Sequence, residues 1–297
     1  MASMDVFSRV PRVRRPASST STTSRLIALL LIVAVATGLA ATVVSASSLP
    51  TCRLADTLTL NRTYSDWSRT LLDTTYRLPS TYAPGDRRST YYAGLSGGGS
   101  VRSFVIPDLR AMARAARAAG ARLAVQSAYR SYSTQRSTFA YWSRVSGYAA
   151  ALRSSARAGH SEHQLGTTID FRSYGGSAPW YYRDWGTSRA GAWLRANAWK
   201  FGFVMSYPKG KFTVTCYSYE PWHYRYVGRA VAAKIRASGL TLREYLWRQQ
   251  TAPAPTPAPS APPSQPPSSE PSAPPSSAPS PEQSIDPGAP SSAEQGS

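Results

Sequence analysis

The chain has 297 residues and a formal net charge of +19 at pH 7, carried mainly by arginine. Its ends do not resemble core-forming sequence, and the middle of about 200 residues is long enough for one domain with its own core. The charge reflects either a compositional bias toward arginine and alanine or attraction to an anionic polymer such as nucleic acid, the acidic cell wall or a membrane surface, and charge alone does not decide between them. The basic residues are scattered and do not alternate with aromatic residues, which argues against a nucleic-acid-stacking surface.

Residues 1–25 form a basic N-terminus, predicted to stay in the cytoplasm because positive charge precedes an uncharged apolar run. That run, from Leu26 to Val44, has about the length needed to span a bilayer as a helix. Val44, Ser45 and Ala46 also resemble a signal-peptide cleavage site. Residues 26–46 are therefore predicted to be a transmembrane anchor, or alternatively a cleaved signal segment. In both cases the rest of the chain is exported.

The two cysteines of the chain are Cys52 and Cys216. In an exported domain a pair of cysteines favours one disulfide. It would join the start of the folded region to a strand just before the candidate site. The alternative is two unrelated buried thiols.

Residues 47–100 are interpreted as a linker and the N-terminal part of the exported region. They include a short helix at 66–72 and a flexible glycine loop at 94–99. Residues 101–250 alternate short strands with helices without a regular βαβ period, which predicts an α+β fold: a small mixed or antiparallel sheet flanked by helices. Helices are expected at 107–119, 133–145, 187–201, 228–237 and after the capping residue Thr241, and strands at 123–127, 168–171, 203–205, 212–215 and 222–227. Residues 251–297, rich in Pro, Ser and Ala, are predicted to be a disordered tail.

The three histidines of the chain fall in two short polar segments. A zinc hydrolase needs three protein ligands and an open position for water, which His163, Asp170 and His223 can provide. Glu220, three residues before His223, is placed to accept a proton from that water. Each pattern alone is weak, but their combination in a chain with so few histidines favours a metal site. His160 is expected to be a supporting or exposed residue and not a ligand.

Three motifs occur in order within residues 101–246: SAYRSYSTQ at 127–135, SEHQLGTTID at 161–170, and EPWH at 220–223. As a set they resemble the VanY-type zinc D-alanyl-D-alanine carboxypeptidases, which act on bacterial cell-wall peptides. The resemblance implies one Zn²⁺ held by His163, Asp170 and His223, with Glu220 as the catalytic base. It further implies that Arg130 stabilises the oxyanion. Ser127, Gln135 and Ser161 match positions that line the peptide cleft, although Gln135 could equally hold the Arg130 loop.

The sequence thus predicts a zinc-dependent peptidase of cell-wall stem peptides, with D-Ala-D-Ala carboxypeptidase as the expected activity. Two alternatives remain: an endopeptidase of the same fold, and a non-catalytic wall-binding zinc module. The presence of both Glu220 and Arg130 argues against the module, because a structural zinc site needs neither. The expected partners are stem peptides, the anionic cell wall and, through residues 26–46, the bacterial membrane; no nucleic acid is expected. An aromatic cluster at 180–185 is either a platform for sugar or peptide, or half-buried packing.

Overall fold

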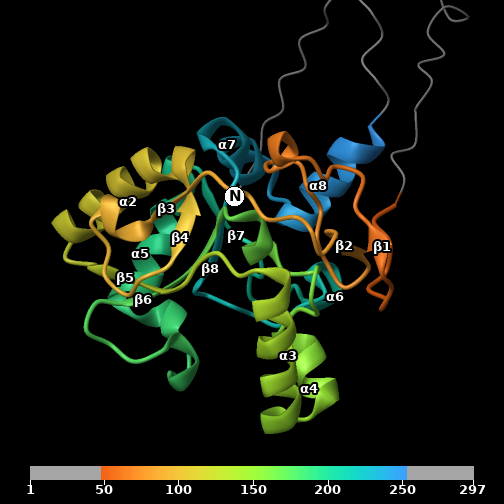
Figure 1. The fold of residues 1–297 in the computed structure, drawn as a ribbon. Helices are drawn as coiled ribbons and strands as arrows, with labels where there is room; N and C mark the ends of the chain where they lie inside the picture. The colour runs from red at the N-terminus through yellow and green to blue at the C-terminus, as the bar shows by residue number, and fades with distance from the viewer. Residues whose placement is uncertain (1–47, 253–297) are drawn as a thin grey trace, which may run out of the picture. The chain divides into compact units, whose positions relative to one another are not determined.

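The computed structural model describes residues 48–252, and its centre is a four-stranded antiparallel sheet (Figure 1). The order across the sheet is β5-β6-β8-β7, so each strand pairs with neighbours running in the opposite direction. The predicted α+β class and small sheet are confirmed. The four strands are β5 (Leu123–Ser127), β6 (Thr168–Ser173), β7 (Phe203–Met205) and β8 (His223–Tyr226).

Helices pack on this sheet through two groups of buried apolar side chains. In the larger group, Leu109 and Met112 of one helix and Leu194 of another meet Phe171 and Phe203 of the sheet. Burying these side chains is the main source of stability for the domain. The helices are α2 (Ile106–Ala118), α3 (Tyr132–Ser146), α4 (Tyr148–Ser154), α5 (Arg189–Asn197), α6 (Phe212–Thr215), α7 (Arg229–Ser238) and α8 (Leu242–Thr251).

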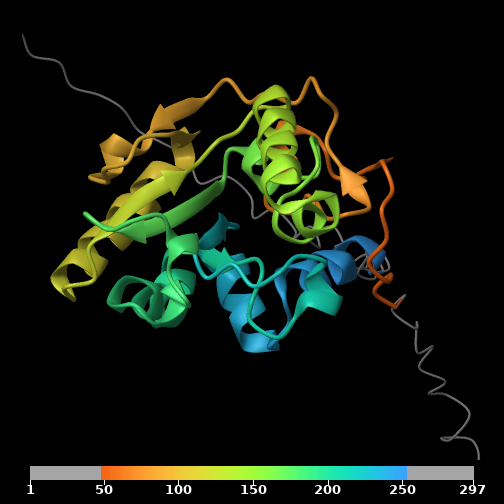
Figure 2. The ribbon, with the colours of Figure 1, turned by 90° about the horizontal axis from the view of Figure 1, so that it is seen from below.

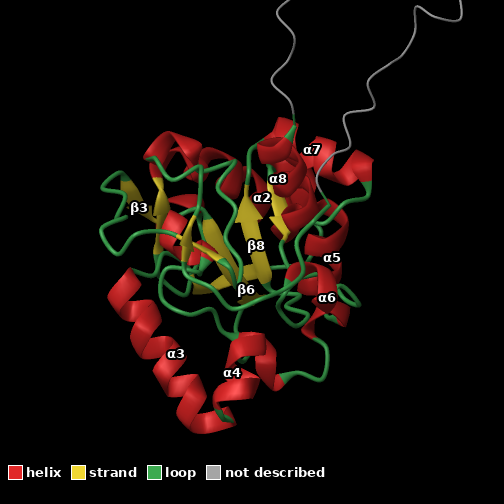
Figure 3. Cartoon of the chain, turned by 90° about the vertical axis from the view of Figure 1, so that its right-hand side faces the viewer, coloured by secondary structure: helices red, strands yellow, loops and turns green. Residues whose placement is uncertain are grey.

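Helices α3 and α4 form a hairpin that projects away from the sheet (Figures 1 and 3). Gln135 is the only fully buried residue of α3, so this helix contributes little to the core. Figure 2 shows α3 directly after the carboxyl end of β5. The hairpin therefore stands beside the end of the sheet where the candidate site residues are found.

The segment expected to be a linker, residues 48–100, contributes to the same compact unit. Leu71 packs with Ile235 and Leu242, whereas Leu72 and Leu78 pack with Leu165. The segment carries two small two-stranded sheets, one parallel and one antiparallel. Their strands are β1 (Thr57–Leu58), β2 (Tyr76–Arg77), β3 (Arg87–Ser89) and β4 (Ser100–Arg102).

The predicted glycine loop at 94–99 covers the outer edge of β5. The Val125 amide donates to the Ser96 carbonyl over 2.7 Å, which satisfies part of that edge. Gly97 approaches so closely that a Cβ there would lie 1.9 Å from the Val125 carbonyl oxygen, and its φ is +105°. Only glycine fits this position.

The N-terminal segment is also fixed covalently. Cys52 and Cys216 form a disulfide with a Cα–Cα distance of 5.4 Å, as predicted. Nearby, the buried Asp73 accepts from Nε of Arg243 in α8 over 2.7 Å. The start of the described chain is thus attached to both α8 and the segment that precedes Glu220.

Two predicted elements are wrong. Residues 66–72 do not form a helix: a 3₁₀ turn, Tyr64–Asp66, ends where the helix was expected to begin, and Leu71 and Leu72 beyond it pack into different apolar groups. Residues 212–215 are not a strand but the short helix α6, ended by Cys216 in a left-handed conformation. Here the disulfide and the contact of α6 with α8 outweigh the strand propensity of its β-branched residues.

Two helix boundaries also differ. Helix α3 begins at Tyr132, before the expected range of 133–145, because Ser131 caps it by accepting from the Thr134 amide. The helix expected to reach residue 201 leaves α-helical geometry after Asn197 and continues as a 3₁₀ turn. The 3₁₀ turns named below are η2 (Thr90–Ala93) and η4 (Glu162–Leu165).

The basic N-terminus at 1–25, the membrane or signal segment at 26–46 and the tail from residue 253 lie outside the described residues. Among the helices at 48–252, none combines the length and apolar character required to cross a bilayer.

The disulfide links residues separated by 164 positions, so it should strongly restrict the unfolded chain. Replacing both cysteines by alanine is expected to lower the free energy of unfolding by roughly 3–5 kcal/mol. Urea denaturation followed by tryptophan fluorescence measures the change. The single variant Cys52→Ala and the reduced parent protein should show the same loss; parental stability in either would contradict a stabilising link.

Candidate metal centre and active site

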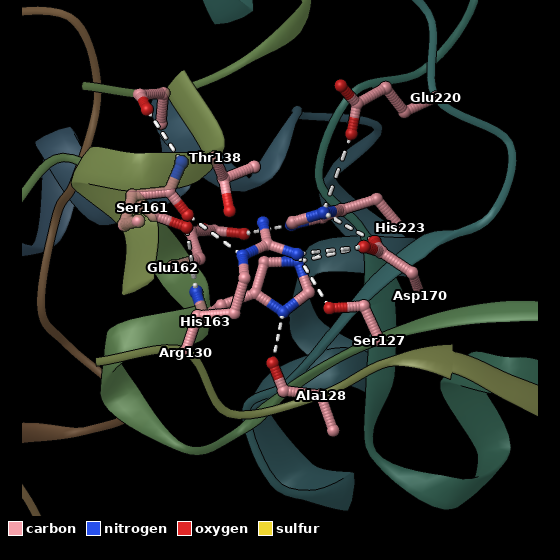
Figure 4. A network of polar contacts seen from close by, with 12 residues as sticks. Ser127, Ala128, Arg130, Thr138, Ser161, Glu162, His163, Asp170, Glu220 and His223 are labelled. Atoms are coloured by element: carbon pink, nitrogen blue, oxygen red, sulfur yellow. Dashed lines mark hydrogen bonds and ion pairs between the residues drawn. The ribbon is translucent and has the colours of Figure 1, made fainter. Parts of the chain in front are cut away.

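Strand register places three predicted site residues in one row across the sheet. Asp170 of β6 pairs with Ser127 of β5 on one side and with His223 of β8 on the other. Side chains at paired positions of neighbouring strands lie close together on the same face. Pairing of the three strands therefore brings Ser127, Asp170 and His223 together on one face of the sheet, without any contribution from loops (Figure 4).

His163 reaches this row from η4, the 3₁₀ turn just before β6. Ser161 caps the turn by accepting from the His163 amide, and Gly166 ends it in a left-handed conformation. The ring is buried, and its Nδ1 donates to the Ala128 carbonyl over 2.6 Å. Burial, reinforced by the nearby Arg130 charge, lowers the pKa of His163 to about 4. The ring is therefore neutral near pH 7, with the lone pair on Nε2.

His223 is held by carboxylates on both sides of its ring. Its Nδ1 lies 3.1 Å from Oδ1 of Asp170, and its Nε2 lies 2.9 Å from Oε2 of Glu162. Burial would lower the pKa of His223, but hydrogen bonds to these two carboxylates raise it to about 10. His163 and His223, which both contact Asp170, hold the pKa of its carboxyl group well below the usual range despite burial.

These three side chains have the arrangement of a metal-ligand set. One donor atom from each of His163, Asp170 and His223 lies within 4.8 Å of the others, and all three residues are buried. Nε2 of His163 has no hydrogen-bond partner within the described residues, although it faces Oδ2 of Asp170 at 3.1 Å. Two electron-pair donors face each other with no proton between them, so a cation would satisfy both. Two imidazoles and one carboxylate suit a divalent metal ion.

Glu220 lies beside this ligand set, in the turn that leads into β8. Its Oε2 is 3.5 Å from Nδ1 of His223, and its main chain is tied to Tyr207 through an amide-to-carbonyl hydrogen bond of 3.1 Å. Burial raises the pKa of Glu220 to about 8. A carboxyl group that titrates near neutral pH is suited to accept and return a proton.

Arg130 lies on the opposite side of Asp170. Nη1 donates to Oγ of Ser127 over 2.6 Å and to Oδ2 of Asp170 over 3.4 Å, and Nε donates to Oε1 of Gln135 over 2.8 Å. Gln135 is fully buried and also donates to the Ala156 carbonyl. This contact with Arg130 fits the second of its two predicted roles, and Gln135 is not among the residues that line the cavity described below.

A cavity of about 620 Å³ opens over these residues. Its floor is formed by the site residues Asp170, His223, Ser127, Ser161, Arg130 and Glu220. Its far wall is aromatic and is formed by Tyr141, Trp142, Trp180, Tyr181 and Trp222. The predicted aromatic cluster is thus divided: Trp180 and Tyr181 face the cavity and are exposed, whereas Trp185 is a fully buried core residue.

Glu162 has a role that sequence reasoning missed. It is buried, holds Nε2 of His223, accepts from Ser206 over 2.5 Å, and pairs with the buried Arg225 over 2.9 Å. Burial would raise the pKa of Glu162, but Arg225, His223 and Ser206 lower it to about 2. The available signal was the two-residue spacing of His223 and Arg225, which places both on one face of a strand. A carboxylate on the second nitrogen of a ligand histidine fixes the ring orientation.

His160 is a supporting residue, as predicted, but it is not exposed. Its ring is fully buried, with Nδ1 2.7 Å from the Asp73 carbonyl oxygen and Nε2 2.9 Å from Oδ1 of Asp56. It therefore connects the second motif to the N-terminal segment and contributes no atom to the metal-ligand set.

Comparison with known proteins agrees with this geometry. The family model described as VanY, D-alanyl-D-alanine carboxypeptidase, matches residues 99–229. The structure resembles that of the LdcB LD-carboxypeptidase, with a TM-score of 0.54 and 34% identity over 60% of this chain and 85% of that one. It also resembles the zinc complex of the vancomycin-resistance D,D-pentapeptidase VanY of the VanB type, with a TM-score of 0.51 and 33% identity over 61% of this chain and 99% of that one. The chain belongs to the VanY-type carboxypeptidase family.

Curated relatives match over part of their length. YodJ of Bacillus subtilis (strain 168) is 39% identical over 145 residues, which are 49% of this chain and 53% of YodJ. A D-alanyl-D-alanine carboxypeptidase of Enterococcus faecalis is 34% identical over 61% of this chain and 66% of that protein. The region matched by the family model, residues 99–229, contains all three motifs.

Glu162 should control metal affinity without touching the ion. The variant Glu162→Gln is expected to bind a divalent metal about 10–100-fold more weakly, because His223 loses the carboxylate that orients it. Competition with a chromogenic chelator measures the affinity. Arg225→Met is the matched control, because it removes the charged partner of Glu162 on its other oxygen and leaves the contact with His223 intact. It should lower stability yet keep metal affinity within about threefold; an equal loss of affinity in both variants would contradict the orienting role.

Metal binding should release protons. At pH 7, His223 with a pKa of about 10 and Glu220 with a pKa of about 8 are protonated, whereas His163 with a pKa of about 4 is not. A metal ion must displace the proton from His223 and favours ionisation of Glu220, so one to two protons should leave. Affinity should therefore fall about tenfold or more per unit as pH falls from 8 to 6. Calorimetry in buffers of different ionisation enthalpy counts these protons; binding without release would contradict the assignment.

Proposed function

We propose that this protein is a zinc-dependent carboxypeptidase that removes the terminal D-alanine from D-Ala-D-Ala stem peptides of the bacterial cell wall. The proposal rests on one observation: the His163–Asp170–His223 ligand set opens through Asp170 and His223 into a cavity that Glu220 and Arg130 also line. A metal site used only for structure is closed by four protein ligands. Here three protein ligands are accompanied by a proton acceptor and a guanidinium group, which are the components of a hydrolytic site.

Relatives support the substrate class. One is named a D-alanyl-D-alanine carboxypeptidase, another is a D,D-pentapeptidase of VanY type complexed with Zn(II), and a third structure shows that pentapeptidase of the VanB type with D-alanine-D-alanine. His163, Asp170 and His223 would hold the zinc ion. When bound, zinc supplies Lewis-acid chemistry by acidifying water and polarising a carbonyl oxygen.

The residues of the chain would perform the remaining steps. Glu220 accepts a proton from the attacking water and transfers it to the departing amine of D-alanine, a sequence suited to a carboxyl group that titrates near neutral pH. Arg130, fixed by Ser127 and Gln135, provides guanidinium N–H donors for the negative charge that develops on the scissile carbonyl oxygen. Ser161 at the cavity floor is positioned to contact the peptide backbone.

A second specificity is favoured by one comparison. The LdcB structure has a TM-score of 0.54 with this chain, and that protein is an LD-carboxypeptidase. The name denotes cleavage between an L-configured and a D-configured residue, as in a tetrapeptide with a single terminal D-alanine, whereas a D,D-enzyme cleaves between two D-configured residues. The catalytic groups would be the same, and only the part of the cavity that receives the penultimate residue would differ.

We also propose that the domain acts outside the cytoplasm, anchored through residues 26–46 or secreted after their removal. The apolar run with its preceding arginines supports this placement. The Cys52–Cys216 disulfide supports it independently, because disulfides persist in oxidising compartments. The expected partners there are stem peptides and the anionic wall.

Substitution of Glu220 should separate metal binding from catalysis. Glu220→Ala is expected to keep one zinc ion per chain and to lose turnover by roughly 10³-fold or more, because the proton acceptor is missing. Asp170→Ala and His163→Ala should lose the zinc ion itself. Metal content by mass spectrometry and release of free D-alanine are the two readouts. Near-parental turnover in Glu220→Ala would contradict the assigned role.

The same assay decides the substrate. Zinc-loaded protein is incubated with a muropeptide pentapeptide, the corresponding tetrapeptide and a cross-linked dimer, each with and without chelator. The proposal expects chelator-sensitive release of D-alanine from the pentapeptide at the highest kcat/KM. Preference for the tetrapeptide would indicate the LD-specificity, and separation of the dimer into two peptides would indicate an endopeptidase.

A further inference from the structure

A second cavity, of about 500 Å³, lies outside the catalytic site. It is formed by one face of α2, the turn η2 that packs on α2, the start of β5 and Tyr174 just after β6. Its volume falls in the range of small-ligand sites. Neither the three motifs nor the proposed reaction makes use of it.

Four arginines line this cavity. Arg110, Arg114 and Arg117 follow one another on α2 at spacings of four and three residues, and therefore share one face, while Arg122 precedes β5. None of the four forms an ion pair with a carboxylate of residues 48–252. Like charges at these helical spacings destabilise the helix. The positive charge is thus concentrated here without neutralisation by the described protein.

Local contacts hold several of these guanidinium groups in place. Arg110 donates through Nε to the Tyr92 carbonyl over 2.9 Å, and Arg117 donates through Nη2 to the Gly94 carbonyl over 3.2 Å. The Arg122 guanidinium lies 3.7 Å from the centre of the Tyr174 ring. Each guanidinium has five N–H donors, so most remain available for a ligand. Main-chain carbonyls orient the groups without removing their charge.

Besides small and aliphatic residues, the lining of the cavity contains three tyrosines that are open to solvent. Tyr91, Tyr92 and Tyr174 are 79%, 57% and 51% exposed, although each carries a large apolar ring. Exposed rings beside unpaired guanidinium groups suit a ligand that combines planar or apolar faces with negative charge. A sugar ring bearing a carboxylate or phosphate has both features.

The position of the cavity relates it to the catalytic site. Strand β5 begins at Leu123, which lines the cationic cavity, and ends at Ser127, which lines the catalytic cavity. Four residue steps along a strand correspond to about 13 Å. In Figures 1 and 2 the strand runs from the end of α2 toward α3. A polymer bound at one end of β5 would therefore lie close to substrate bound at the other.

We propose that this cationic cavity is a binding site for an anionic glycan, a polymer of sugar rings that carry carboxylate or phosphodiester groups. A glycan is favoured over nucleic acid because the disulfide indicates an oxidising compartment, and because the site is a local cavity and not a groove that follows a nucleic-acid backbone. Occupation of the site would hold the domain on wall polymer while the catalytic cavity acts on a neighbouring peptide. This last role rests on the proposed function, whereas the binding itself does not.

Binding can be measured without any catalytic readout. A fluorescently labelled oligogalacturonate, whose sugar rings each carry a carboxylate, is titrated with the full chain at several salt concentrations. The double variant Arg114→Gln and Arg117→Gln is expected to bind at least about tenfold more weakly, and its salt dependence should drop by about two charges. The control Lys234→Gln and Arg248→Gln removes two exposed positive charges from α7 and α8, outside both cavities, and should lose less than about threefold.

Two further binding measurements identify the chemical class of the ligand. Tyr91→Ala should weaken oligogalacturonate binding several-fold but leave inorganic polyphosphate, which has charge and no ring, unchanged. Zinc content and melting temperature should match the parent in all variants. Equal losses in the cavity variant and the control, absence of oligogalacturonate binding by the parent, or tighter binding of duplex DNA than of the glycan would each overturn the proposal. Failure of the muropeptide assay would leave this binding result unaffected.

Discussion

The site depends on the pairing of β6 with β8, which places the Asp170 carboxylate directly opposite the His223 ring. If β8 shifted by one residue against β6, its side chains would turn to the other face of the sheet, and His223 would point away from Asp170. Tyr224, its neighbour in sequence, would then leave the core that it now fills together with Phe171 of β6. Burial of the apolar neighbours and assembly of the metal-ligand set are therefore the same structural event, and the sheet cannot be stable in a register that separates the ligands.

Residues outside the metal-ligand set orient its histidine rings through hydrogen bonds and ion pairs. His163 is oriented by the Ala128 carbonyl, His223 by Glu162, and Glu162 by the buried Arg225 and Ser206. Buried ion pairs contribute little net stability, since desolvation offsets their attraction. The direct contacts of the two rings, with the Ala128 carbonyl and with Glu162, instead fix which nitrogen of each ring faces the centre of the site, and that is a geometric requirement for metal binding.

Much of the site was predictable from sequence, because its residues belong to short motifs whose spacing is local. His163, Asp170, His223, Glu220 and Arg130 lie together as expected. The contact of Glu162 with His223 was not predicted, because nothing in the motif itself shows that the side chain next to ligand His163 is buried against the second nitrogen of His223. The long periodic helices were also predictable, whereas residues 66–72 and 212–215 were not. In those short segments the packing of Leu71 and Leu72 in different directions and the Cys52–Cys216 link outweigh local propensity.

The central claim is that His163, Asp170 and His223 bind one metal ion and leave a position open for water. X-ray absorption at the zinc edge, combined with metal analysis of the parent and the Asp170→Ala variant, tests it most directly. The account predicts one zinc ion per chain, bound by two imidazole nitrogens and oxygen ligands at about 2.0–2.2 Å with no sulfur, and lost in the variant. A zinc ion with four protein ligands, or one retained in full without Asp170, would contradict it.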